Sequence, residues 1–209
     1  MRATLLPYNA NANHPMRHDP IKLRELGSLE YRDPIAFLKS IRAFEIEVST
    51  SQIPDRMKRL RTGPLKAERE RRDAALFCVG MAELTGQKIW MADAEDQDFD
   101  FVTCWFVDGV QHICPVQLKE VAPADLDPHG GFEKVFKSLG RYADAEDLVV
   151  AVKLGRQMRF DPAALKIPDD LTLSELWVFG GITPEQSKWA IWGDFMQGPV
   201  SEGRVFNYP

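Results

Sequence analysis

The strongest constraint on the fold of this chain is a pair of apolar segments that lie close together in the sequence. Residues 99–107 and 110–121 are rich in β-branched and aromatic residues, and a single Asp-Gly dipeptide separates them. An Asp-Gly pair between two such segments is a strong short-range signal for a β-hairpin with a two-residue turn. The sequence therefore predicts two antiparallel strands in which Val107 lies opposite Val110.

Counting back from this turn predicts a cluster of polar side chains at the far end of the hairpin. Asp100 falls opposite Gln117, and Asp98 falls opposite Lys119. Directly opposed residues project from the same face of a sheet, so these four side chains share one face. Pro115 fits this register only at an edge or a bulge, because it has no N–H. A cluster this polar in an apolar hairpin needs ion partners, a bound cation or an open cleft.

The segments around the hairpin predict a mixed α/β fold. Asp33 and Pro34 are typical of a helix start, and a later Gly86 is typical of a helix end. The connection between residues 121 and 148 is long enough for a helix that joins two parallel strands. The expected helices are 33–48, 65–85 and 131–139, and the further strands are 88–91, 148–154, 175–182 and 188–192. We expect a central mixed β-sheet flanked by helices.

The order of these features resembles the PD-(D/E)xK nuclease superfamily, also called restriction-endonuclease-like, in a Gln-x-Lys variant. An acidic helix comes first, then Asp100 on one strand of a hairpin, then Gln117-Leu118-Lys119 on the other, then a helix and a strand. The resemblance covers about residues 68–154. It leaves both ends of the chain unexplained. With the sequence patterns of these ends, we expect three parts: an N-terminal arm and helix (1–62), a nuclease-like α/β core (63–156) and a small β-rich extension packed on that core (157–209).

The resemblance also implies a role for each residue of the hairpin cluster. Asp100, Gln117 and the backbone carbonyl of Leu118 would hold Mg²⁺ or Mn²⁺, and Lys119 would position or activate the attacking water. Oxygen ligands suit a hard cation that polarises a phosphodiester. The usual acid of this strand motif is replaced here by Gln117, a neutral ligand that weakens the electrostatic hold on a metal. If the strand register is shifted by two residues, Asp98 takes the place of Asp100 as the predicted metal ligand.

A fourth catalytic residue is expected from the acidic start of the helix at 65–85. Glu70 lies four residues before Ala74 and seven before Phe77, on the stripe that we expect to face the core. Glu68 and Asp73 are alternatives for this acid.

The net charge of the chain does not by itself indicate a nucleic-acid-binding protein. The 26 Lys and Arg residues are outnumbered by 31 Asp and Glu residues, which gives a formal net charge of −5. The segment 55–72 is nevertheless locally basic, so phosphate contacts are expected there. For any one of these residues, a salt-bridged helix face is the competing interpretation. The expected contacts are Arg59, Arg61, Lys66, Arg69 and Arg72.

These patterns lead to two functional hypotheses. The first is metal-dependent hydrolysis of DNA phosphodiester bonds. The second is a non-catalytic nuclease-like scaffold that binds a protein partner through the region of Trp177, Trp189 and Trp192. A homodimer is a further expectation about partners. The three cysteines form no CxxC pair and are expected to be buried thiols. No segment has the roughly 20 apolar residues of a membrane span, so we expect no membrane partner and a cytoplasmic location.

Overall fold

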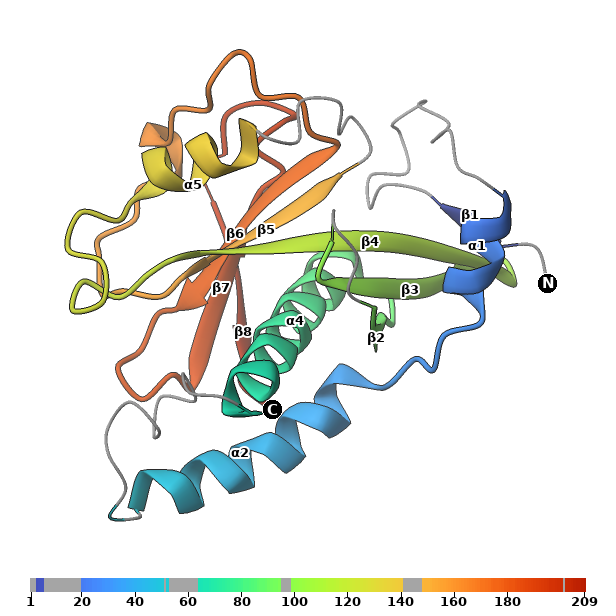
Figure 1. Ribbon diagram of the computed structural model, residues 1–209, viewed down its shortest axis with the longest axis horizontal. Helices are drawn as coiled ribbons and strands as arrows, with labels where there is room; N and C mark the ends of the chain where they lie inside the picture. Colours follow the sequence, from blue (N-terminus) through green and yellow to red (C-terminus); the bar gives the residue numbers. More distant parts are fainter. Residues whose placement is uncertain are drawn as a thin grey trace.

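The computed structural model describes residues 3–5, 20–50, 52, 64–94, 99–140, 148–200 and 202–209. In this part of the chain, helices flank a curled, mixed β-sheet (Figure 1). The helices are α1 (Pro20–Gly27), α2 (Pro34–Thr50), α4 (Pro64–Thr85), α5 (Phe132–Leu139) and the short 3-10 helix η2 (Pro162–Ala164). None of the described helices combines the length and the apolar character needed to cross a membrane.

The strands confirm the expected mixed sheet. They are β1 (Ala3–Leu5), β2 (Trp90–Asp93), β3 (Phe101–Val107), β4 (Val110–Val121), β5 (Val149–Leu154), β6 (Glu175–Gly181), β7 (Lys188–Trp192) and β8 (Arg204–Asn207). The order across the sheet is β2-β3-β4-β5-β6-β7-β8, and β1 pairs with β4. β4, β5 and β6 are parallel, and the other neighbours on this path are antiparallel. The predicted parallel connection from β4 through α5 to β5 is therefore confirmed.

The C-terminal strands differ from the expected small extension. β6 pairs with β5 from Glu175 to Gly180, and β7 and β8 continue the same sheet. β6 can occupy this interior position because its residues are buried on both faces of the sheet. The chain after residue 157 thus completes the central sheet.

The hairpin register is confirmed residue by residue. β3 and β4 pair from Val107 opposite Val110 to Phe101 opposite Val116. The turn residues Asp108 and Gly109 have φ angles of 51° and 76°. Two consecutive positive φ angles are the signature of the type I′ turn, whose twist matches that of the two strands.

Pro115 is tolerated in β4 because one side of the strand is locally an edge. On one side it lies opposite Val102 of β3. On the other side, the β1 ladder ends opposite Ile113 and the β5 ladder begins opposite Val116. The missing N–H of proline therefore falls in a gap between two neighbouring strands.

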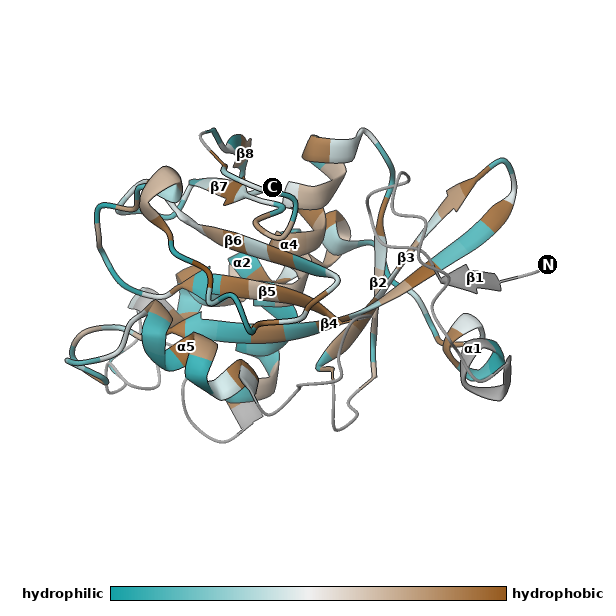
Figure 2. Cartoon of the chain, turned by 90° about the horizontal axis from the view of Figure 1, so that it is seen from above, coloured by the Kyte–Doolittle hydropathy of each residue, from teal (hydrophilic) through white to brown (hydrophobic). Residues whose placement is uncertain are grey.

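The sheet separates two hydrophobic cores. On one face, which we call the α4 face, helix α4 packs onto alternate sheet residues such as Val116 and Ala151. On the other face, the α5 face, helix α5 packs onto residues such as Val150 and Val152. Figure 2 shows α1 and α5 on the same side of β4. Because side chains alternate along a strand, neighbouring residues of β4 project toward different helices.

Candidate functional site

The structure brings three of the predicted metal ligands together. Asp100 immediately precedes β3 and lies beside Gln117 of β4. Its Oδ2 accepts a hydrogen bond from the backbone N–H of Leu118 at 2.7 Å and another from the Gln117 side-chain amide. The Gln117 amide also donates to the carbonyl oxygen of Leu118 at 3.2 Å. Gln117 is only 5% exposed, whereas Asp100 and Leu118 are partly exposed.

Lys119 projects from the same face of β4 as Gln117. It is half-buried and lies opposite Val152 in the ladder with β5. Asp98, which the sequence places opposite Lys119, lies outside the described residues. β3 starts at Phe101, opposite Val116, so in the described chain residues 118–121 have only β5 as a strand neighbour. The polar cluster thus lies at the start of β3, where its described pairing with β4 begins.

This cluster lies between two patches of hydrophobic core on the α5 face. Ile113, before the cluster in β4, belongs to the core that contains Leu26 of α1. Val121, after the cluster, belongs to the core under α5. The polar side chains of Gln117 and Lys119 therefore interrupt an otherwise apolar face, which is unusual for a strand in the middle of a sheet.

The groups around Asp100 fit a hard divalent cation by their chemistry. The Leu118 N–H points toward Asp100, and in an extended strand the carbonyl of the same residue points to the same side. The amide oxygen and nitrogen of Gln117 exchange places by a flip, so its oxygen can also face this point. Within the described residues no group of three or more His, Cys, Asp and Glu could hold a metal, and the three cysteines are free and buried. Mg²⁺ commonly binds one or two carboxylates and takes its remaining ligands from phosphate and water.

The predicted helix acid is not brought to this cluster. Glu70 has a 43% exposed side chain and forms ion pairs with Lys66 at 3.4 Å and Arg69 at 3.8 Å. Glu68, one alternative, pairs with Arg71. Helix α4 covers the α4 face, whereas Gln117 and Lys119 project from the α5 face. The sheet itself therefore separates these acids from Lys119.

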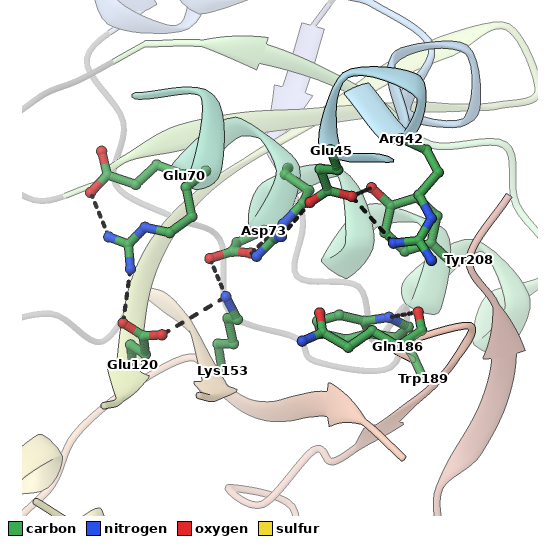
Figure 3. Close-up of polar contacts among 11 residues, drawn as sticks. Arg42, Glu45, Glu70, Asp73, Glu120, Lys153, Gln186, Trp189 and Tyr208 are labelled. Carbon is green, nitrogen blue, oxygen red and sulfur yellow. Dashed lines mark hydrogen bonds and ion pairs between the residues drawn. The ribbon is translucent and has the colours of Figure 1, made fainter. Parts of the chain in front are cut away.

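Asp73, the other alternative, is buried and belongs to a different set of charges. Its Oδ2 lies 2.7 Å from Nζ of Lys153 in β5, and its Oδ1 lies 3.1 Å from Arg72. Lys153 also lies 3.8 Å from Glu120 of β4. Figure 3 shows Asp73, Glu120 and Lys153 pointing toward one another between α4 and the sheet. Arg69 completes the arrangement with a 3.1 Å ion pair to Glu120.

These charges form a continuous chain across the α4 face, which we call the buried ion network. Arg72 also pairs with Glu45 of α2, and the hydroxyl of Tyr208 donates to Glu45 at 3.2 Å. The network is defined as Glu45, Arg69, Arg72, Asp73, Glu120 and Lys153. It joins α2, α4, β4, β5 and the C-terminal residues.

Electrostatics keep the buried carboxylate of this network ionised. Burial opposes ionisation of Asp73, but the charges of Lys153 and Arg72 outweigh that effect and hold the pKa of Asp73 below its ordinary value of 3.8. Sequence reasoning missed this network as a unit. The available signal was Lys153, a charged residue inside the apolar segment 148–154, because such a residue is rarely buried without a partner.

The predicted phosphate contacts divide into three groups. Arg59 and Arg61 lie outside the described residues. Lys66 has a 63% exposed side chain at the start of α4. Arg69 and Arg72 are only 12% and 13% exposed, and both are paired with carboxylates of the buried ion network. These ion pairs hold α4 against its neighbours. Because both guanidinium groups are already paired and mostly buried, they are poorly placed to bind a phosphate.

The tryptophans proposed for partner binding lie mostly inside the protein. Trp177 and Trp189 are buried in the core of the α4 face. Their ring N–H groups donate to Glu175 at 2.7 Å and to the carbonyl of Gln186 at 2.9 Å. Trp192 is partly buried against the other core. These three rings therefore offer little surface to a protein partner.

His112 gives a prediction for the pH dependence of stability. Its ring is buried and stacks on Trp105 with ring centroids 5.5 Å apart, and among the described residues its buried Nδ1 has no hydrogen-bond partner. Burial lowers the pKa of His112 below its ordinary value of 6.5. As the pH falls below 6.5, the unfolded chain takes up a proton that the folded chain does not. The free energy of unfolding of the wild type should therefore decrease.

The test is urea denaturation at a series of pH values below neutrality. His112→Phe keeps an aromatic ring against Trp105 but cannot take up a proton. Its free energy of unfolding should fall less steeply with decreasing pH than that of the wild type. Equal slopes for the two proteins would show that His112 does not contribute to the acid sensitivity.

No family model, no curated protein and no solved structure matches this chain.

Proposed function

We propose that this protein is a metal-dependent nuclease that hydrolyses phosphodiester bonds of DNA. The observation that carries the proposal is the contact of the Asp100 carboxylate with Gln117 and Leu118 at the start of β3, with Lys119 on the same face of β4 as Gln117. The order of elements, helix α4, strands β2 to β4, helix α5 and strand β5, agrees with what the motif resemblance implies.

The roles of the residues follow from their chemistry. Asp100, the Gln117 amide oxygen and the Leu118 carbonyl would hold Mg²⁺ or Mn²⁺, which when bound polarises the phosphodiester. The ammonium group of Lys119 would hold the attacking water near the phosphorus and offset negative charge on the phosphate oxygens. Because Asp100 is the one carboxylate among the proposed ligands, metal binding should be weak until phosphate supplies further oxygen ligands.

The proposal is tested by incubating the full-length protein with double-stranded and single-stranded DNA in the presence of Mg²⁺ or Mn²⁺. Cleavage that requires the metal and stops with EDTA is the expected result. RNA is included as a second substrate, since the proposed chemistry acts on the phosphodiester that DNA and RNA share. The absence of metal-dependent turnover on all of these substrates would overturn the proposed function.

Metal binding gives a separate prediction for Asp100. We expect calorimetric titration with Mn²⁺, in the presence of a short non-cleavable DNA analogue, to give one binding event per chain. Asp100→Ala should abolish it, because Asp100 provides the only charged ligand of the predicted set. Asp169→Ala, a change of an exposed acid before β6, is the matched control and should bind like the wild type. Unchanged binding in Asp100→Ala would exclude this site.

A further inference from the structure

The segment of β4 that carries Lys119 has less strand support than the rest of the hairpin. Up to Val116, β4 is paired with β3, and from Val116 it is also paired with β5. Past Gln117, the described chain provides only the β5 ladder. The outward N–H of Leu118 is satisfied by the Asp100 carboxylate instead of by a strand. Side-chain contacts on this segment therefore contribute to fixing its position.

Glu120 provides such contacts from the opposite face of the sheet. It follows Lys119 directly, so the two side chains project to different faces. Its carboxylate binds Arg69 of α4 at 3.1 Å and lies 3.8 Å from Lys153, its neighbour in the β5 ladder. Gly155 closes the remaining side, because a Cβ at that position would lie 3.0 Å from Cδ of Glu120.

The partners of Glu120 are themselves fixed. Lys153 is bound to Asp73 at 2.7 Å, and the side chains of both residues are less than a tenth exposed. Asp73 is in turn bound to Arg72. A buried set of ion pairs contributes little net stability compared with apolar residues of the same shape, but it does select one arrangement of the elements it joins. In this protein the ion pairs fix the position of α4 relative to the paired strands β4 and β5.

We propose that Glu120 is a positioning residue that fixes the backbone of Lys119 for the reaction. This inference depends on the proposed function, in which Lys119 acts on the phosphate and its water. Arg69 and Lys153 hold Glu120 from two elements, and Glu120 holds the strand at the residue next to Lys119. Glu120 lies on the face away from the proposed metal ligands and contacts no reacting group.

The test compares Glu120→Ala and Glu120→Gln with the wild type. In Glu120→Ala, kcat for DNA cleavage should fall about tenfold with KM unchanged, because displacement of a catalytic group by about 1 Å can cost up to a hundredfold. Glu120→Gln keeps the shape and an oxygen for Arg69, so its kcat should fall less. Glu133→Gln, an exposed acid of α5, is the control and should leave kcat unchanged.

A second measurement does not require turnover. Amide hydrogen exchange at residues 118–121 should become faster in both Glu120 variants, whereas exchange at residues 110–116 should stay as in the wild type. If the wild type does not cleave DNA, the proposed function fails while the exchange result still decides whether Glu120 fixes this segment. Unchanged exchange at 118–121, faster exchange over the whole chain, or a change in KM alone would overturn the positioning role.

Discussion

Replacement of Lys119 by alanine should lower kcat for DNA cleavage by roughly 10²–10⁴-fold, a range that covers the loss of a charge-stabilising group and the loss of a group that handles a proton. Lys119 lies on the same face of β4 as Gln117. It is not one of the proposed metal ligands. Mn²⁺ affinity should therefore stay close to that of the wild type. Lys166→Ala, a change of an exposed lysine between η2 and β6, is the control and should retain full activity.

Lys119→Arg separates two roles of the ammonium group. Arginine keeps the positive charge but does not give up its proton in proteins. If Lys119 acts mainly by offsetting phosphate charge, the arginine variant should recover part of the lost activity. If it acts as a base toward water, the arginine variant should be as slow as the alanine variant. Wild-type rates in Lys119→Ala would exclude the catalytic role altogether.

The hairpin could be predicted from the sequence because its signals are local. The Asp-Gly turn and the apolar strands on both sides fix the register without reference to the rest of the chain. The start of α2 is equally local, since Asp33 Oδ1 accepts hydrogen bonds from the N–H groups of Ile35 at 2.8 Å and Ala36 at 3.2 Å. β8 was missed, because four residues without a clear alternation carry little signal of their own.

The polar contacts of the site divide in the same way. The contact between Asp100 and Gln117 follows from the hairpin register. The pair between Asp73 and Lys153 does not, because 80 positions separate these residues and only the packing of α4 on β5 brings them together. Helical periodicity placed Glu70 on the core-facing stripe, whereas in the structure the buried acid is Asp73, one turn farther along α4.

The buried ion network leads to the largest expected effect on stability. Lys153→Met should lower the free energy of unfolding by about 3 kcal/mol, at the lower end of the roughly 3–5 kcal/mol cost of breaking a buried pair. The lower end applies because Asp73 keeps Arg72 as a partner at 3.1 Å. Asp73→Leu should cost more, since among the described carboxylates Lys153 then keeps only Glu120 at 3.8 Å. Urea denaturation with unchanged m-values measures both effects.

The double variant Asp73→Leu/Lys153→Met distinguishes the cost of an unpaired charge from the value of the pair itself. With both charges removed, no charge of this pair is left buried, and the free energy of unfolding should return to within about 1–2 kcal/mol of the wild type. The exposed pair of Lys134 and Asp127 is a matched control at a similar distance of 2.6 Å, with the lysine side chain 69% exposed. Lys134→Met should change stability by less than about 1 kcal/mol, because water screens that pair. Additive losses in the double variant would mean that Asp73 and Lys153 do not act as a pair.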